Sequence, residues 1–257
     1  MGSEKPDAID LSLNDKAPDL SIVIPVYNEE DNLEPLIQEI EQVLARLKRS
    51  CEIICVDDHS SDQSLQVLYR LQATRPHLRV LQHRLNCGES AGEVSGFQHA
   101  RAEIIITIDA DQQNDPADIP ALLDAMESAV AAVCGVRRKR EDDWVKRISS
   151  RIANGFRNVM TGDRIADAGC TFRALRREAL REIPVFNGLH RFLPTILRLQ
   201  GYEIREIHVN HRPRIRGVSK YGVGNRMWRG ILDCLAIRWY SHRCLPGRRV
   251  SGKNGES

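Results

Sequence analysis

Short β-branched runs alternate with segments of helical periodicity along the first half of this 257-residue chain. The first run, Leu20–Val26, is followed from Leu33 to Leu47 by apolar residues spaced three and four apart. The cycle returns with strand-like runs at Glu52–Val56, Leu78–Gln82 and Ile104–Ile108. Strands that alternate with helices pair through crossover connections, so the pattern predicts an α/β fold with a doubly wound, mostly parallel sheet flanked by helices.

Turn and cap signals separate these elements. Asn32 and Asp62 stand just before helical segments, where their side chains are expected to cap the first turn. A glycine-containing loop, Asn86–Gly92, is expected before the third helix, and Pro116 favours the first turn of the fourth. Beyond Val136 the further elements expected are helix Trp144–Met160, strand Gly169–Leu175, a helix near Arg177, a helix ending at Gly201 and strand Ile204–Val209.

The charge of the chain is balanced overall but not along its length. The 37 Lys and Arg residues nearly cancel the 35 Asp and Glu residues, which argues against a strongly basic nucleic-acid coat. Between Arg212 and Arg249, however, ten basic residues face only one acid, Asp233. Within that segment Met227–Trp239 places Trp228, Leu232, Leu235 and Trp239 on one helical face. The pattern favours an amphipathic helix that lies in a membrane interface, with packing on the domain as the alternative.

Other features bear on the compartment. The seven cysteines are scattered and form no C-x-x-C pair, which indicates a reducing compartment rather than a disulfide framework or a zinc site. Neither a signal peptide nor an apolar run of 18 residues is present, so any membrane contact is expected to be peripheral.

Three acidic turns follow consecutive predicted strands: Tyr27-Asn28-Glu29, Asp57-Asp58 and Asp109-Ala110-Asp111. Ligands of open parallel sheets bind beyond the carboxyl ends of the strands, so these turns are expected to meet at one rim. Asp109, Asp111 and Gln113 offer hard oxygen ligands that suit Mg²⁺ or Mn²⁺. A divalent ion held there could stabilise a diphosphate leaving group. Pro-Val-Tyr-Asn-Glu-Glu stands where a dinucleotide-binding Gly-rich loop would follow the first strand, and neither a P-loop nor a Gly-x-Ser-x-Gly elbow occurs.

Three motifs carry a family resemblance. Val23-Ile24-Pro25-Val26-Tyr27-Asn28-Glu29, Val56-Asp57-Asp58-His59-Ser60-Ser61-Asp62 and Asp109-Ala110-Asp111-Gln112-Gln113-Asn114-Asp115-Pro116 resemble the GT-A glycosyltransferases of family 2. More narrowly, they resemble dolichol-phosphate mannose synthases and bacterial polyprenyl-phosphate glycosyltransferases. The resemblance implies that the nucleoside is held by Pro25, Tyr27, Glu29, Val56 and Asp58, and the metal and diphosphate by Asp109, Ala110, Asp111 and Gln113.

The downstream half adds the phosphate-binding residues that the resemblance implies. Arg137, expected after the fifth strand, would contact the donor, and Arg151, Arg214 and Lys220 would bind phosphate groups of donor and acceptor. A lipid monophosphate already carries about −1.5 to −2 charges, so it needs positioning more than a general base. A hydroxyl acceptor would call for a base, and Asp167 is the candidate. His190 and Cys170 are assigned no chemical role.

The resulting hypothesis is an inverting, metal-dependent transfer of one sugar from GDP-mannose or a UDP-sugar to a polyprenyl or dolichyl phosphate. The reaction is placed at the cytoplasmic membrane face, on an anionic surface, with no nucleic acid involved and a membrane-anchoring partner left open. One alternative is a family 2 transferase with a saccharide or protein hydroxyl acceptor, and another is a non-catalytic binding module for RNA or anionic membrane. The expected organisation is a disordered tail 1–19, a GT-A catalytic domain 20–222, an interfacial helix 223–243 and a disordered tail 244–257.

Overall fold

The computed structural model describes residues 17–137, 155–213 and 223–244, and for residues 223–229 it describes the backbone alone. One seven-stranded sheet runs through the molecule, with the strand order β3-β2-β1-β4-β6-β5-β7. Only β6 is antiparallel to its neighbours, β4 and β5. The strands are β1 Leu20–Val26, β2 Cys51–Asp57, β3 Leu78–Gln82, β4 Ile104–Thr107, β5 Val130–Arg137, β6 Arg173–Arg176 and β7 Glu203–Val209.

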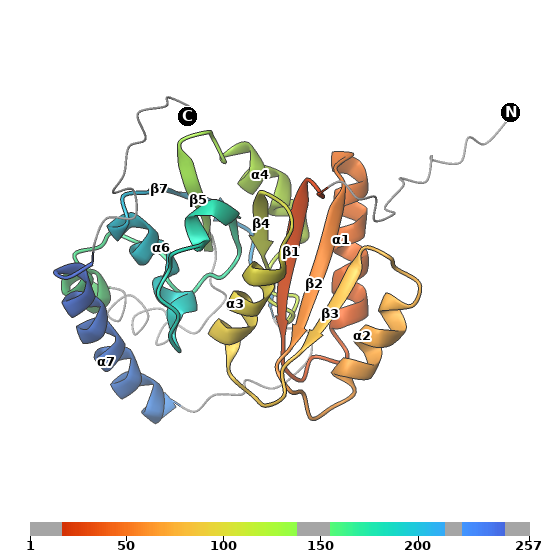
Figure 1. The fold of residues 1–257 in the computed structure, drawn as a ribbon, viewed down its shortest axis with the longest axis horizontal. Coiled ribbons are helices and arrows are strands. Elements are labelled where there is room, and N and C mark those ends of the chain that lie inside the picture. The colour runs from red at the N-terminus through yellow and green to blue at the C-terminus, as the bar shows by residue number, and fades with distance from the viewer. Residues whose placement is uncertain (1–16, 138–154, 214–222, 245–257) are drawn as a thin grey trace, which may run out of the picture.

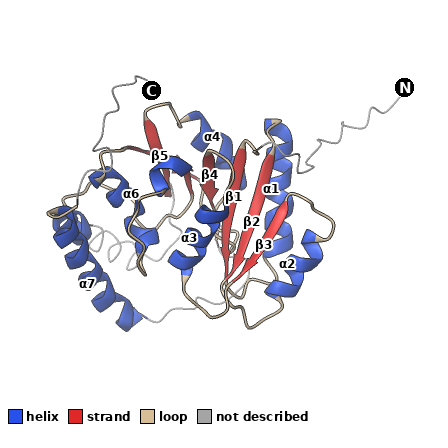
Figure 2. Ribbon diagram, in the orientation of Figure 1, coloured by secondary structure: helices blue, strands red, loops and turns tan. Residues whose placement is uncertain are grey.

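Helices cover both faces of this sheet (Figures 1 and 2). Ile22 and Ile24 of β1 contribute to a core with the helices α1 and α2, whereas Val23 belongs to a second core with α3, α6 and α7. This two-sided burial explains why the strands read as continuous apolar runs. Among the described residues, besides the helical stretch 155–161, the α-helices are α1 Leu33–Leu47, α2 Ser64–Gln72, α3 Glu89–His99, α4 Ile119–Asp124, α6 Leu189–Leu199 and α7 Val223–Ser241, with 3₁₀ helices Pro116–Asp118 and Arg177–Leu180. Among the described helices, none has both the length and the apolar composition to cross a bilayer.

The doubly wound, mostly parallel sheet is confirmed, but several boundaries differ from the expectation. The helix α3 begins at Glu89, so Gly92 lies inside it rather than in a loop. Positions 92 and 96 hold glycine because α3 passes close to β1: a Cβ added to Gly96 would lie 2.2 Å from Cγ1 of Val23. Close packing and turn formation both favour glycine, and the sequence alone did not separate them.

The helix caps expected at Asp62 and Asn32 also differ from the structure. Asp62 accepts a hydrogen bond from the backbone N–H of Ser64, the first residue of α2, at 2.9 Å, but the N-cap residue is Gln63, which makes no side-chain cap. Asn32 makes no side-chain cap; instead its Nδ2 donates to Glu29 Oε2 at 2.7 Å. Asp115 caps the 3₁₀ turn before α4, since it accepts from the N–H of Ala117 at 3.0 Å.

In the second half of the chain, the observed elements differ from the expected ones mainly in length. The strand expected at Gly169–Leu175 is the shorter β6, and the helix near Arg177 is a single 3₁₀ turn. Residues 155–161 are helical, whereas the rest of the expected helix Trp144–Met160 lies outside the described residues.

Candidate functional site

The three acidic turns meet at the carboxyl end of the sheet. Since β1 lies between β2 and β4, the turns that follow these strands become neighbours. The N–H of Asp58 donates to the carbonyl of Val26 at 2.8 Å, and the N–H of Ile108 donates to that of Val23 at 3.2 Å. The hydrogen-bond ladder therefore extends past the strands and carries Asp58 and Asp109 to the same rim, as expected from the motif spacing.

The turns after β1 and β2 interlock beside Tyr27. The backbone N–H groups of Asn28 and Glu29 donate to the hydroxyls of Ser60 and Ser64, at 3.0 and 2.8 Å. Asn28 adopts a left-handed backbone conformation, with φ 54°, and its Oδ1 accepts from the N–H of Ser61 at 2.7 Å. These bonds hold the exposed ring of Tyr27 at the surface beyond the strand end, where an aromatic face can stack on a base.

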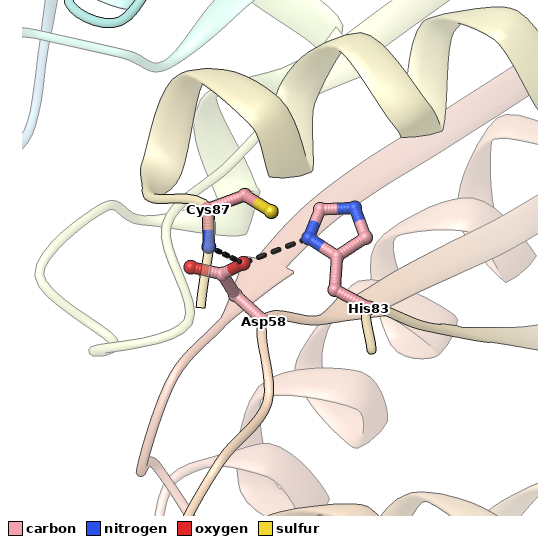
Figure 3. Close-up of side chains that lie close together, drawn as sticks. All are labelled: Asp58, His83 and Cys87. Atoms are coloured by element: carbon pink, nitrogen blue, oxygen red, sulfur yellow. Dashed lines mark hydrogen bonds and ion pairs between the residues drawn. The ribbon is translucent and has the colours of Figure 1, made fainter. Parts of the chain in front are cut away.

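Asp58 is the centre of a hydrogen-bonded cluster with His83 and the segment before α3 (Figure 3). Its Oδ1 lies 2.7 Å from His83 Nδ1 and accepts from the N–H of Cys87 at 2.8 Å. Its Oδ2 accepts from the N–H of Gly88 at 2.7 Å. The side chains of Asp58, His83 and Cys87 are close enough to hold a cation, but the bonds already made by the carboxylate explain the cluster without one.

Asp109 and Asp111 form the expected oxygen-rich corner. Burial and the neighbouring charge of Asp111 raise the pKa of Asp109 to about 6, although Thr171 donates to its carboxylate and opposes that rise. Asp111 Oδ1 accepts from the N–H of Gln113 at 3.1 Å, which turns the chain back toward the rim. A buried acid whose pKa is raised by a neighbouring carboxylate, with both groups presenting hard oxygens, fits a divalent cation such as Mg²⁺ or Mn²⁺.

Sequence comparison agrees with this geometry. A family model described as Glycosyl transferase family 2 matches residues 21–184, which include all three acidic turns. The chain belongs to glycosyl transferase family 2.

Two curated relatives from this family act on polyprenyl phosphates, as their names state. The undecaprenyl-phosphate 4-deoxy-4-formamido-L-arabinose transferase of Edwardsiella ictaluri is 36% identical over 206 residues, which are 79% of this chain and 63% of that protein. The dodecaprenyl-phosphate galacturonate synthase of Rhizobium johnstonii is 33% identical over 236 residues, which are 89% of this chain and 69% of that protein. The chain thus spans a little under two thirds of the first relative's length.

Solved glycosyltransferases share the fold. A glucosyl-3-phosphoglycerate synthase from Mycobacterium tuberculosis, in complex with Mg²⁺ and UDP, has a TM-score of 0.64 at 18% identity and covers 85% of this chain and 80% of its own. The mannosyltransferase PcManGT from Pyrobaculum calidifontis, in complex with GDP-Man and Mn²⁺, has a TM-score of 0.58 at 20% identity, covering 94% and 74%. The expected GT-A fold is confirmed by this likeness.

Arg137 of this family 2 protein forms an ion pair with the carboxylate of Asp167. It is the last residue of β5 rather than the one after the strand. Its Nε and Nη2 donate to the two oxygens of Asp167, both at 2.7 Å. The charge of Arg137 partly opposes the rise in the pKa of Asp109, so the guanidinium lies near the proposed metal corner. Arg137 thus lies near Asp109, with Asp167 as its counter-ion.

A buried charged group beneath the rim was not expected. Arg173 of β6 and Glu93 of α3 are almost fully inaccessible to solvent. Burial raises the pKa of Glu93 to about 7, with Arg173 lowering it and Asp109 raising it. The signal that could have found them is a charged residue inside a segment that is otherwise small and apolar, as in Gly92-Glu93-Val94 and Phe172-Arg173-Ala174.

The start of α3 also contacts the start of α6. Ser90 Oγ lies 2.7 Å from His190 Nδ1 and accepts from the N–H of Gly188 at 3.0 Å. His190 Nε2 lies 3.6 Å from Glu89 Oε2. His190 therefore joins the two helices at the rim, a position that the sequence did not reveal.

The loop that follows Asp109 and carries the candidate metal ligands is hydrogen-bonded to the residues just after β7. The N–H of Arg212 donates to the carbonyl of Gln113 at 2.8 Å, and Asn114 forms a β-bridge with His211. Arg212 also donates to Asp115 and Glu39, at 2.8 and 2.6 Å. The predicted phosphate ligands Arg151, Arg214 and Lys220 lie outside the described residues.

Proposed function

We propose that this chain catalyses the inverting transfer of a single sugar from a nucleotide-diphosphate sugar to a polyprenyl phosphate. The product would be a lipid-phosphate-linked sugar that serves as a donor for glycan or cell-envelope assembly. The observation that carries the proposal is the joint presence of the Asp109–Asp111 corner and two relatives, each more than 30% identical, whose names specify polyprenyl-phosphate acceptors.

The donor half of the proposal uses the three acidic turns. Tyr27, with Pro25, Glu29, Val56 and Asp58, would hold the nucleoside. Asp109, Asp111 and Gln113 would hold Mg²⁺ or Mn²⁺, with Ala110 beside the diphosphate. The metal, when bound, would neutralise charge that develops on the departing diphosphate.

The acceptor half relies on arginine and lysine rather than on a base. A phosphate monoester is already anionic at neutral pH, so orientation against the sugar's anomeric carbon is the main requirement. The planar guanidinium of Arg137 matches phosphate oxygens in pairs. Arg151, Arg214 and Lys220 are proposed to complete the phosphate clamp.

The geometry of Asp167 favours a phosphate acceptor over a hydroxyl acceptor. A general base needs a carboxylate oxygen that can take a proton from the nucleophile. Both Asp167 oxygens instead accept hydrogen bonds from Arg137, and its side chain is only 7% exposed. A carboxylate held in this way is a poor proton acceptor, because the adjacent cation stabilises its charged form.

Contact with a membrane is proposed through α7. The buried side of this helix, which includes Cys234 and Ile237, packs on the core, whereas Leu232, Leu235 and Trp239 are exposed. α7 lies beyond α6, on the opposite side of the molecule from β3 (Figure 1). An exposed apolar face with nearby arginines suits peripheral binding to an anionic surface, here proposed as the cytoplasmic face.

The test is transfer from radiolabelled UDP- and GDP-sugars to short-chain polyprenyl phosphate in the presence of Mn²⁺. We expect a lipid-linked sugar with inverted anomeric configuration, and loss of transfer in Asp111→Asn with the unfolding temperature unchanged. A matched reaction contains a polyprenol without the phosphate. Transfer to the polyprenol, or to a saccharide alone, would favour the hydroxyl-acceptor alternative, and nucleotide binding without any transfer would favour a binding module.

A further inference from the structure

We propose that Asp58, His83 and Cys87 form a second metal site, which takes Zn²⁺ or a divalent cation of similar ligand preference and is separate from the Asp109–Asp111 corner. One ligand atom from each of the three side chains lies within 4.8 Å of the other two. Within the residues that the structure describes, no other three His, Cys, Asp or Glu side chains come together in this way. The donors are one sulfur, one nitrogen and one oxygen, a set that suits Zn²⁺ rather than Mg²⁺.

Three separate elements hold these donors together without a metal. Asp58 follows β2, and its side chain is only 5% exposed. His83 follows β3, where its N–H donates to the carbonyl of Asp57 at 2.9 Å and extends the ladder. Cys87 lies just before α3, and its N–H donates to Asp58 Oδ1 at 2.8 Å. Because the sheet and these hydrogen bonds already gather the three side chains, a cation that enters does not have to order them.

The ring of His83 can offer a lone pair to a metal and keep its second contact. Its Nδ1 lies 2.7 Å from Asp58 Oδ1 and carries the proton when no metal is bound, since an ionised carboxylate only accepts. Its Nε2 lies 2.8 Å from the hydroxyl of Ser95 on α3. A hydroxyl both donates and accepts, so Ser95 can bind either tautomer of the ring. A partner at the second ring nitrogen is what orients most histidines that bind metals.

Cys87 supplies the thiolate and a path from solvent. It is the one exposed cysteine of the seven in the chain, all of which lie in the described residues. Figure 3 shows its thiol turned toward the ring of His83. Three residues separate His83 from Cys87, a spacing that occurs between zinc ligands but is not a C-x-x-C pair. The scattered cysteines of the sequence therefore do not reveal this site.

Metal entry exchanges protons for the cation. The ion binds Nδ1 of His83 in place of its proton, and that proton is carried on Nε2 instead, where it faces Ser95. Thiolates rather than thiols bind zinc, so Cys87 releases one proton to solvent, whereas the carboxylate of Asp58 has none to lose. Ligand atoms around tetrahedral Zn²⁺ lie about 3.4 Å apart, so the 2.7 Å contact between Nδ1 and Oδ1 has to open by about 0.7 Å.

One consequence rests on the proposed function, in which Asp58 belongs to the nucleoside site. Zn²⁺ engages this carboxylate and moves it away from His83, so the ion and the nucleotide oppose one another's binding. Linkage requires that Zn²⁺ weakens nucleotide binding by the same factor by which the nucleotide weakens Zn²⁺ binding.

The test uses Co²⁺, which occupies zinc sites and gives a near-ultraviolet charge-transfer band when a thiolate coordinates it. The full chain is titrated with Co²⁺ in saturating Mg²⁺, which fills the Asp109–Asp111 corner. We expect a band that saturates at one ion per chain, disappears when Zn²⁺ is added and is absent in Cys87→Ser. In His83→Asn, which keeps an N–H for Asp58, the affinity for Co²⁺ should fall by roughly tenfold or more. Cys244→Ser removes another cysteine that is not fully buried and is the matched control.

A second measurement counts protons. Calorimetry of Zn²⁺ binding in buffers of different ionisation enthalpy should show about one proton released for each ion. The absence of a charge-transfer band in the wild-type chain would overturn the inference, and so would a band that persists in Cys87→Ser. A band that UDP and GDP leave unchanged would support the metal site and count against the nucleoside role of Asp58. The expected band without any glycosyl transfer would support the metal site and count against the proposed function alone.

Discussion

The hydroxyl of Thr171 lies 2.6 Å from each carboxylate oxygen of Asp109. Thr171 lies two residues before the start of β6, and its carbonyl accepts a hydrogen bond from the hydroxyl of Thr107 at the end of β4. The proposed metal ligand is thus oriented from a segment 62 residues away in the sequence. Because this hydroxyl stabilises the charged form of Asp109, it makes the carboxylate a better cation ligand.

Replacing Thr171 should weaken metal binding. Thr171→Val keeps the shape but removes the donor, so Asp109 loses orientation and its pKa rises further above its ordinary value. Loss of such an orienting partner costs roughly 10-fold or more in metal affinity. Titration of Mn²⁺ in the presence of UDP measures the change, and Thr171→Ser is expected to behave like the wild type. Equal Mn²⁺ affinity in the valine variant would show that Asp109 needs no support from this hydroxyl.

Glu93 should make the stability of the fold fall as the pH rises. Burial raises its pKa from 4.5 to about 7, so the folded state favours the neutral acid. That stability is fully present below pH 4.5 and is lost as the pH rises through about 7, by roughly 3 kcal/mol in all. Glu93→Gln cannot ionise, so its unfolding free energy should match the wild type at pH 5 and exceed it at pH 8.5. Denaturant unfolding across this range is the measurement, and parallel curves for the two proteins would contradict the prediction.

Much of the rim could be predicted from sequence, and what was missed shares a cause. Asp58, Asp109 and Asp111 follow strands whose apolar runs are unmistakable, so their common edge follows from parallel pairing alone. Arg173 at the start of β6 and Thr171 two residues before it reach the same site, and β6 is only four residues long. It enters between β4 and β5 in the antiparallel sense, and hydrophobic periodicity does not encode that strand order.

The helix starts show a second limit. The start of α3 supplies N–H groups to Asp58 and places Ser90 against His190, yet its glycines indicated a loop. Backbone donors have no sequence signature, because every residue except proline carries one. The partners of an acidic side chain therefore become visible only when the path of the chain past it is known.

Asp167 and Arg137 should respond differently to substitution. If Asp167 only orients Arg137, then Asp167→Asn retains one acceptor and should lower kcat by less than roughly tenfold. Arg137→Ala removes a proposed phosphate ligand and should lower kcat/KM by about 100-fold or more. Steady-state transfer assays at saturating Mn²⁺ compare the two. A loss of several thousandfold in Asp167→Asn, with UDP binding unchanged, would instead identify Asp167 as a base for a hydroxyl acceptor.

Glu52 provides a test of stability that should leave the site alone. It is fully buried at the start of β2, at the end of the sheet away from Asp58. Burial raises its pKa, but hydrogen bonds from Ser21, Arg101 and Arg79 outweigh this effect and lower the pKa below 4.5. The resulting stability is present above pH 4.5 and is lost as the pH falls. Glu52→Gln should destabilise the fold by roughly 3 kcal/mol at pH 7, because two arginines lose their buried partner, with the nucleotide affinity of the folded fraction unchanged.

Membrane binding should depend on the outer face of α7. Trp239 is 67% exposed and Leu235 47% exposed, so neither contributes much to the core, and their replacement should leave the unfolding temperature nearly unchanged. If this face inserts into the bilayer interface, the double variant Leu235→Ser, Trp239→Ser loses apolar burial in the lipid and should bind vesicles at least roughly tenfold less tightly. Flotation with vesicles that contain phosphatidylglycerol measures this, and vesicles of phosphatidylcholine alone report the electrostatic part. Tyr69→Ser is the matched control, because Tyr69 is 49% exposed on α2, across the molecule from α7. Equal flotation of all three proteins would remove α7 from the proposed membrane contact, whereas loss confined to the α7 variant would place the acceptor lipid on the side of the molecule that α7 borders.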